Sequence, residues 1–124
     1  PVATAAGIAT LEVLFENPDI YKRIDENTKL LTDGIENIMN TNEKRVHINR
    51  IGSLMSVFFT SQNVKSYKDV LTCDLDKYAR YYSFLRENGI YIAPSQFEAV
   101  FVSDAHSIED IKNTLSIIAG FGGK

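Results

Sequence analysis

The sequence lacks several features that would announce a particular chemistry. It has no tryptophan, two histidines and a single cysteine, Cys73, so it cannot form a disulfide within the chain, and no Cys/His set has metal-ligand spacing. No apolar run approaches the ~20 residues of a membrane span, and the N-terminus lacks the basic start and apolar stretch of a signal peptide. These absences predict a cytoplasmic protein with no metal site and no membrane segment.

The charge balance argues against a protein that binds nucleic acid. Acidic residues outnumber basic ones by 16 to 13, so no broad basic surface exists to neutralise phosphates, and nucleic-acid binding loses its main source of affinity. A content of 44% hydrophobic and 23% charged residues is typical of a globular chain rather than a disordered one. At 124 residues, the chain is predicted to form one domain, residues 1–124, with a packed core.

The first predicted helix, residues 2–15, is rich in Ala and Leu. Ala3, Gly7 and Leu11 lie at a spacing of four residues, so their small side chains would let another helix or a sheet approach closely. Pro1 suits a first helical position, but no residue ahead of it could cap the exposed N–H groups. We therefore expect that the start of a longer chain has been removed.

Three further helices are predicted from caps and helical spacing. Asn17 is expected to cap a helix that runs to about Met39 and carries a stripe of Ile and Leu side chains. Asp74 begins another helix, which ends at Gly89. A capping-box pattern at residues 107–110 begins the last one, followed by a tail, residues 120–124, that is expected to fray.

The remaining segments have the patterns of strands and loops. Residues 45–50 alternate apolar and polar side chains, and residues 54–60 are mostly apolar, so each is predicted to be a strand. Residues 61–71 read as a surface loop, whereas residues 90–92 and 99–102 are expected to be antiparallel neighbours. The predicted fold is α+β, with a small, mainly antiparallel sheet covered on one face by helices.

Most reactive side chains have an ordinary structural interpretation beside a functional one. His47 is expected to face solvent, and His106 either caps a turn or does acid–base work. Cys73 precedes a helix N-terminus that could lower its pKa, although an inert thiol is the alternative. Tyrosines cluster in the second half of the chain, where they could line a pocket or simply pack.

One carboxylate stands out by its surroundings. Glu98 lies between Phe97 and an apolar segment, in a Pro-containing turn that also holds Ser95 and Gln96. A charged group in an apolar setting needs a partner or a shifted pKa, and such settings are commoner at functional sites than on ordinary surfaces. The alternative is a solvated loop carboxylate.

The stretch around Glu98 resembles a known family. Residues 89–103 (GIYIAPSQFEAVFVS) and the following Ser-Ile-Glu-Asp-Ile pattern at residues 107–111 are similar to the closing segment of the glutamate-1-semialdehyde aminomutases, class III aminotransferases of fold type I. Residues 1–7 (PVATAAG) resemble the start of the helix that follows this family's Gly-Asn-Pro step. Residues 52–60 (GSLMSVFFT) resemble its Gly-Ser-Met/Leu strand, so the resemblance spans nearly the whole chain.

The resemblance implies a function for a larger protein. Members of this family convert glutamate-1-semialdehyde into 5-aminolevulinate for tetrapyrrole (porphyrin) biosynthesis, as homodimers that use pyridoxal phosphate or pyridoxamine phosphate. Their Schiff-base lysine belongs to a large domain absent here, so no cofactor ligand is expected in this chain. Glu98 matches the Glu of the family's SQFEA motif and is the implied catalytic residue, with Ser95 and Gln96 as supporting loop residues.

Two hypotheses follow. The first is a C-terminal domain of such an enzyme, inactive alone because aldimine chemistry needs the missing lysine, with the large domain as its partner. The second is a free-standing α+β interaction module without catalysis. The first also predicts that the 2–14 helix and a sheet edge expose apolar surface.

Overall fold

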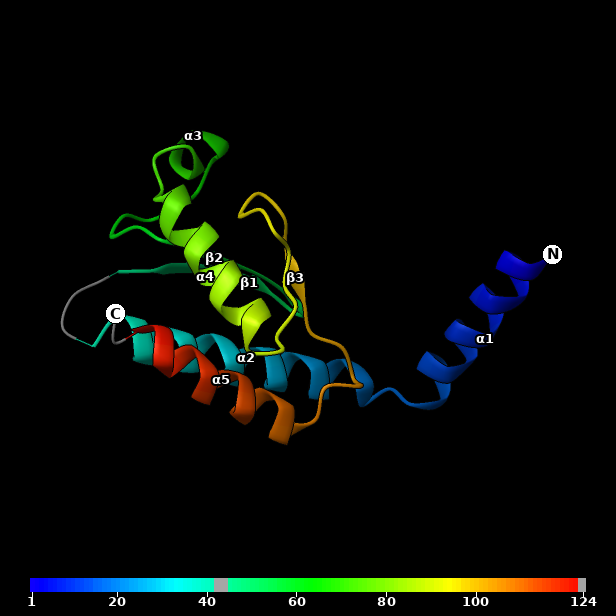
Figure 1. The fold of residues 1–124 in the computed structure, drawn as a ribbon. Coiled ribbons are helices and arrows are strands. Elements are labelled where there is room, and N and C mark those ends of the chain that lie inside the picture. Colours follow the sequence, from blue (N-terminus) through cyan, green and yellow to red (C-terminus); the bar gives the residue numbers. More distant parts are fainter. Residues whose placement is uncertain (42–44, 123–124) are drawn as a thin grey trace.

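The chain folds around one small antiparallel sheet. In the computed structural model, which describes residues 1–41 and 45–122, five helices and three strands form in these ranges. They are α1 (Val2–Glu16), α2 (Ile20–Met39), β1 (His47–Ile51), β2 (Leu54–Phe58), α3 (Tyr67–Val70), α4 (Leu75–Glu87), β3 (Val100–Phe101) and α5 (Ile108–Gly122). The strands lie in the order β1-β2-β3, and helices pack against the sheet (Figure 1). The α+β prediction is confirmed.

The pairing of the strands shows which side chains lie on the same face of the sheet. β1 and β2 form a hairpin whose turn contains Gly52, at a φ of 53°, which is a left-handed conformation that suits glycine. Successive side chains alternate between faces, and Met55 and Val57 are both buried on the face toward the helices. Leu54, its partner Ile51 and its other neighbour Phe101 therefore lie on the opposite face.

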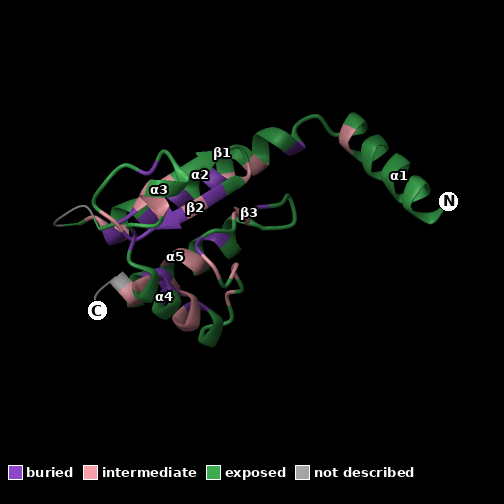
Figure 2. Ribbon diagram, turned by 90° about the horizontal axis from the view of Figure 1, so that it is seen from above, coloured by how far each residue is buried: buried purple, intermediate pink, exposed green. Residues whose placement is uncertain are grey.

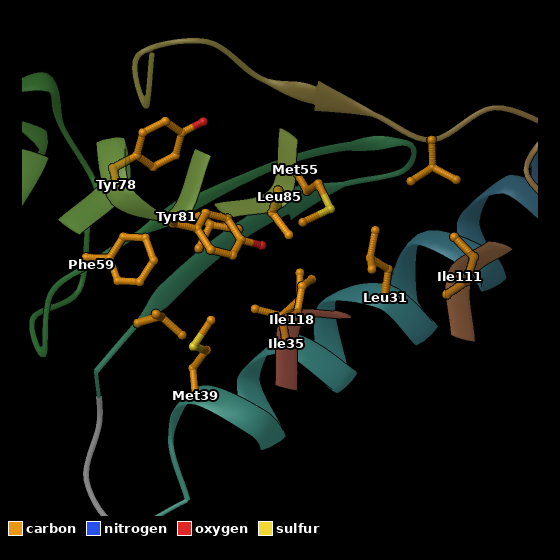
Figure 3. Packing of buried hydrophobic residues seen from close by; sticks show 13 residues of the cluster. Leu31, Ile35, Met39, Met55, Phe59, Tyr78, Tyr81, Leu85, Ile111 and Ile118 are labelled. Carbon is orange, nitrogen blue, oxygen red and sulfur yellow. The ribbon is translucent and has the colours of Figure 1, made fainter. Parts of the chain in front are cut away.

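The core fills the space between the sheet and helices α2, α4 and α5. α2 contributes the apolar stripe predicted from its sequence, and α5 packs beside it (Figures 1 and 3). The buried members of the cluster are Leu31, Ile35, Met39, Val46, Met55, Val57, Phe59, Tyr78, Tyr81, Leu85, Val102, Ile111 and Ile118. Burying apolar area of this kind contributes roughly 25 cal/mol per Å².

A glycine sets the distance between α2 and α5. A Cβ atom built on Gly34 would lie 2.5 Å from both terminal methyl carbons of Leu115. Glycine within a helix costs about 1 kcal/mol relative to alanine. Here its missing side chain makes room for Leu115, so the two helices pack closely.

A second, smaller cluster covers part of the other face of the sheet. Phe58 packs there with Val64 and Cys73, and the Asn49 side chain donates a hydrogen bond to the Val64 carbonyl at 3.0 Å. The predicted surface loop is wrong at α3, because Ser66 and Asp69 form a capping box that begins a short helix.

Three predicted caps are confirmed, those at Asp74, at Gly89 and at the Ser107–Asp110 capping box, and the one at Asn17 is wrong. The Asp74 side chain accepts a hydrogen bond from the Lys77 amide at 2.8 Å, and Gly89 follows α4 with a φ of 82°. Asn17 instead ends α1, where its side chain donates to the Val13 carbonyl at 2.9 Å. The following helix begins at Ile20, because the Pro18 and Asp19 segment forms a turn between the two.

The predicted strand at residues 99–102 is confirmed by β3, but the predicted strand at residues 90–92, and the pairing of the two, are wrong. Residues 90–93 are irregular, because their backbone groups bond to α4 and not to a strand. The Ile90 amide donates a hydrogen bond to the Leu85 carbonyl at the end of α4, and the Ala93 carbonyl accepts one from the Tyr78 hydroxyl. β3 pairs with β2 instead. Ile90 and Ile92 nevertheless pack against the core, which explains their apolar character.

The predicted frayed tail is also wrong as far as residue 122, because α5 continues to Gly122. Phe121 holds this end of the helix in place. Its ring lies 5.3 Å from that of Tyr81 and 5.6 Å from that of Phe84, in edge or tilted geometry. Residues 123 and 124, like residues 42–44 of the expected polar turn, lie outside the described residues.

α1 stands away from the rest of the domain. None of its residues is buried, as Figure 2 shows. Val2 and Phe15 are 85% and 89% exposed. Gly7 has nothing within 4 Å of where a Cβ would lie, so the close approach expected along this helix does not occur within the described residues. The predicted exposure of its apolar surface is confirmed.

Candidate functional site

Residues 94–98 form the turn that was singled out from the sequence. The Ser95 hydroxyl accepts a hydrogen bond from the Phe97 amide at 3.2 Å, and the Ser95 carbonyl accepts one from the Glu98 amide at 3.1 Å. Ser95 therefore organises the turn through both its side chain and its backbone. Its role as a supporting residue for Glu98 stays a prediction.

Gln96 anchors the turn to a distant segment. Its side chain is 3% exposed, and its Nε2 donates to the Val70 carbonyl at 3.2 Å, at the end of α3. Its Oε1 is buried and has no hydrogen-bond partner among the described residues. Rotating the amide by half a turn would place Oε1 against the Val70 carbonyl, so the Nε2 contact fixes the orientation. An acceptor left in this state costs about 1–3 kcal/mol.

Glu98 lies at the edge of the main core. Its side chain is exposed, yet it lines a cavity of about 30 Å³ together with Gln96, Tyr78 and mostly apolar side chains. Within residues 1–41 and 45–122 the Glu98 carboxylate has no hydrogen-bond or ion-pair partner. Val100 lines the same cavity, whereas Phe101, which pairs with Leu54, lies on the other face of the sheet.

Tyr78 belongs to the core and lines the same cavity as Glu98. Its hydroxyl donates to the Ala93 carbonyl at 2.8 Å, and its ring lies 6.5 Å from that of Phe59 in edge geometry. Burial, then the nearby charge of Glu98, then Tyr82 raise the pKa of the Tyr78 hydroxyl to about 12. Tyr78 is therefore a neutral hydrogen-bond donor beside Glu98 at physiological pH. The sequence showed it only as one of the clustered tyrosines, with no sign of its proximity to Glu98.

The residues around Glu98 do not fit a pyridoxal phosphate site by themselves. The cavity of about 30 Å³ is an order of magnitude smaller than the about 300–1,000 Å³ of sites that bind small molecules. Lysines 22, 29, 65, 68 and 112 are exposed, Lys77 is half-buried, and none of these six lines the cavity. None of these six amines is therefore placed to form a Schiff base at the Glu98 cavity.

The other reactive side chains have structural roles. His106 packs in a turn, where its Nδ1 accepts a hydrogen bond from the Ser103 amide at 2.9 Å. His47 is half-buried, with Nε2 3.0 Å from the Asn49 Oδ1, on the face opposite Val46 and Ile48. Neither histidine is near Glu98 in the cavity lining.

Cys73 is an inert thiol rather than an activated one. It is 7% exposed, and its Sγ donates a weak hydrogen bond to the Asp69 carbonyl at 3.5 Å. Burial and the charge of Asp69 raise the pKa of the thiol, which opposes any effect of the following helix N-terminus. Two of the clustered tyrosines, Tyr78 and Tyr81, both pack in the core and line the cavity.

The described residues contain neither a metal site nor a membrane segment. No three His, Cys, Asp or Glu side chains in residues 1–41 and 45–122 are placed to hold a metal ion together. No helix in these ranges combines the length and apolar character needed to cross a membrane.

Comparison with known proteins finds aminomutases that match nearly the whole of this chain. The chain is 44% identical over 119 residues to the glutamate-1-semialdehyde 2,1-aminomutase of Syntrophus aciditrophicus and 43% identical over 122 residues to that of Clostridium kluyveri. The enzyme of the same name from Thermosipho africanus is 39% identical over 124 residues, the whole of this chain. This chain matches the C-terminal part of a glutamate-1-semialdehyde 2,1-aminomutase.

The match extends over nearly all of this chain but over only a part of each aminomutase. It covers 96%, 98% and 100% of this chain but only 28%, 29% and 29% of these three aminomutases. No protein-family model matches the chain. The chain thus spans less than a third of the length of its aminomutase relatives, and it contains the turn that carries Glu98.

Proposed function

We propose that this chain is the C-terminal domain of an enzyme that converts glutamate-1-semialdehyde into 5-aminolevulinate in tetrapyrrole biosynthesis, and that it has no activity alone. The observation that carries the proposal is the match at 39–44% identity over almost every residue of the chain to proteins with this activity in their names. The missing part of such an enzyme supplies the cofactor-binding large domain.

Glu98 is the residue of this domain that we assign to the reaction. Its carboxylate is exposed at the mouth of a cavity, it has no partner among the described residues, and a turn braced by Ser95 and Gln96 holds its backbone. A carboxylate in this state can accept a proton from, or orient, the amino and oxo groups of a small substrate. Ser95 and Gln96 act as positioning residues, because they touch the turn rather than the substrate.

The pyridoxal or pyridoxamine phosphate cofactor belongs to the part of the enzyme outside this chain. When bound there it supplies the electron sink for moving the amino group. The six described lysines do not line the Glu98 cavity, which is the reason for assigning the Schiff-base lysine elsewhere. A homodimeric, cytoplasmic enzyme completes the proposal.

The apolar helix α1 supports a larger parent protein. A helix that is apolar on all sides is normally enclosed by protein or lipid. α1 has no buried residue, and its exposed side chains include Val2, Leu11 and Phe15. In the proposal, the rest of the enzyme encloses it.

The size and colour of the natural product test the parent. We expect a protein several times heavier than 13.9 kDa that absorbs between about 300 and 450 nm as a bound pyridoxal or pyridoxamine phosphate does. The measurement is mass spectrometry and absorbance of the product captured with an antibody against this chain. A colourless product of 13.9 kDa would instead support the free-standing interaction module.

The Glu98→Gln variant of the full-length enzyme tests the residue. We expect turnover to fall about 10²-fold or more, because the amide cannot exchange protons as the carboxylate does. The cofactor absorbance should stay normal, since no described residue around Glu98 is assigned to the cofactor. Glu109→Gln, an equivalent change at an exposed site on α5, is the matched control. Unchanged turnover in Glu98→Gln would remove the assigned role.

A further inference from the structure

A groove separate from the Glu98 turn lies between α4, the ends of α2 and α5, and the segment that precedes β1. α2 and α5 run side by side in the same direction, so their C-terminal ends meet there (Figure 1). The volume of the groove is about 430 Å³, compared with about 30 Å³ for the cavity beside Glu98, and the two share no described lining residue. The larger volume is within the about 300–1,000 Å³ of sites that bind small molecules.

The floor of the groove is apolar. It consists of Met39 at the end of α2, Phe84 of α4 and Phe121 of α5. The rings of Phe84 and Phe121 lie 5.6 Å apart in tilted geometry, and both side chains are half-buried. Aromatic rings in such a position can pack against the flat ring of another molecule. The floor therefore suits a ligand with an apolar ring.

The rim of the groove carries three basic side chains, Arg45, Lys77 and Arg80. Lys77 and Arg80 are three residues apart, and Phe84 follows after four more, so one face of α4 presents both cations and the ring. The Lys77 ammonium lies 5.6 Å from the centre of the Phe59 ring. Arg80 is exposed and has no ion-pair partner among the described residues. We call this hollow, with its basic rim and apolar floor, the basic groove.

The positive charge of the basic groove is not explained by the stability of α4. The chain as a whole is acidic, yet the described lining of the groove has three basic residues and one acidic residue, Asp74. The Asp74 carboxylate caps the helix by accepting a hydrogen bond from the Lys77 amide at 2.8 Å. A cation in the first turn of a helix opposes the helix dipole, and like charges three residues apart repel each other. Lys77 and Arg80 therefore point to a bound anion.

We propose that the basic groove binds a small organic anion, with a carboxylate or phosphate group on an apolar ring. The planar Arg80 guanidinium can donate two parallel hydrogen bonds to either group, and the Lys77 ammonium adds a second positive charge. The ring of the ligand would lie on Phe84 and Phe121. This inference does not rest on the proposed function, because the groove contains none of the residues assigned to the reaction.

Titration calorimetry of the full-length protein with three matched probes tests the site. The probes are 2-naphthoate, which carries a carboxylate on an apolar ring system, its uncharged analogue 2-naphthamide, and 2-naphthyl phosphate. The variants Arg80→Gln and Lys77→Gln each remove one charge from the rim. The control variant is Arg86→Gln, because Arg86 is an exposed arginine of the same helix that does not line the groove.

We expect 2-naphthoate to bind about tenfold or more tightly than 2-naphthamide, because hydrogen bonds between charged groups are stronger than those between neutral ones. Arg80→Gln and Lys77→Gln should each weaken its binding about fivefold or more, and Arg86→Gln should change it by less than about twofold. Tighter binding of 2-naphthyl phosphate would identify phosphate as the preferred group, and tighter binding of 2-naphthoate would identify carboxylate.

Three results would overturn the inference. The first is that none of the probes binds to the full-length protein. The second is equal binding of 2-naphthoate and 2-naphthamide, because the basic rim would then contribute nothing. The third is binding of 2-naphthoate that both Arg80→Gln and Lys77→Gln leave unchanged, because the probe would then occupy another site.

Discussion

Helices α1 and α2 lie next to each other in the chain, and both carry apolar side chains, but only α2 packs against the rest of the domain. α2 gathers its apolar residues on one stripe, and Leu31, Ile35 and Met39 are buried in the core (Figure 3). α1 carries apolar residues on all sides and buries none of them. A helix with one apolar side is satisfied by one neighbour, whereas an apolar helix without a polar side needs to be surrounded.

This difference shows which part of the chain forms a complete hydrophobic core within the described residues. The core from α2 to α5 closes on itself through the sheet and a precise contact between Gly34 and Leu115. α1 buries none of its residues and lies outside the cluster that holds the domain together, so removing its side chains should affect the free chain little.

The largest predicted contrast is between a core leucine and a leucine of α1. Leu85→Ala should lower the free energy of unfolding by about 2–5 kcal/mol, because Leu85 is 1% exposed and its loss leaves a cavity. Leu11→Ala should change it by no more than about 0.5 kcal/mol, because Leu11 is 67% exposed. Urea unfolding followed by circular dichroism measures both. Equal losses would mean that α1 packs on the domain.

Two glycines provide a second, smaller contrast. Gly34→Val should destabilise the chain by about 1–3 kcal/mol, because the new side chain would overlap Leu115 and force α2 and α5 apart. Gly7→Val should be nearly neutral in the isolated chain, because nothing lies within 4 Å. Thermal and urea unfolding of both variants are the measurements. Adding Leu115→Ala should recover part of the Gly34→Val loss and none of any Gly7→Val loss.

The third prediction concerns high pH and involves the core alone. Burial raises the pKa of the Tyr78 hydroxyl to about 12, and burial also raises that of Tyr81. A raised pKa means that the folded state holds the proton more tightly, so this stabilisation is complete below about pH 10 and is lost as the pH rises through 12. Tyrosine absorbance at 295 nm and urea unfolding at each pH test this. Glu98→Gln should lower the Tyr78 pKa slightly; an unchanged or higher value would contradict their proximity.

The smallest predicted effect is on a surface ion pair that joins α2 to the segment before α5. Arg23 donates two hydrogen bonds to Asp104, at 2.9 and 2.7 Å, and this contact holds the pKa of the Asp104 carboxyl below its ordinary value. The lowered pKa stabilises the folded state at any pH above the pKa of this carboxyl in the unfolded chain. The stabilisation is lost as the pH falls through the pKa of the carboxyl in the folded chain, which lies below 3.8. Asp104→Asn should therefore cause a small loss at pH 7 that disappears in acid. Stability curves at both pH values, with Asp76→Asn as an exposed acidic control on α4, test this.

Local signals predicted most of the elements. Helix caps and turn glycines act within a few residues, so the neighbouring residues in the sequence are enough to predict them. Examples are the Asp74 cap, the capping box of Ser107 and Asp110, and Gly52 and Gly89. Ser66 and Asp69 form a local capping box of the same kind, and it begins α3 within the predicted loop. Asn17 was misread because an Asn between two helices can serve either end.

Long-range relations could not be predicted from such signals. The pairing of β3 with β2 joins segments more than 40 residues apart, so two nearby apolar stretches were matched with each other instead. At the candidate site, the sequence indicated Glu98 and its turn. It carried no sign that Gln96 is buried against Val70 or that Tyr78 lies beside Glu98, because both relations depend on how α3 and α4 fold over the turn.

The pairing of α2 with α5 has a consequence for the order of synthesis. A ribosome releases α2 early, but the residues that cover its apolar stripe, among them Ile111 and Ile118, follow only after all three strands. Until then the nascent chain carries exposed Leu31 and Ile35, and native contacts of this sequence separation form slowly. A chaperone that binds apolar nascent segments would therefore have its longest opportunity at α2, and release would coincide with the emergence of α5.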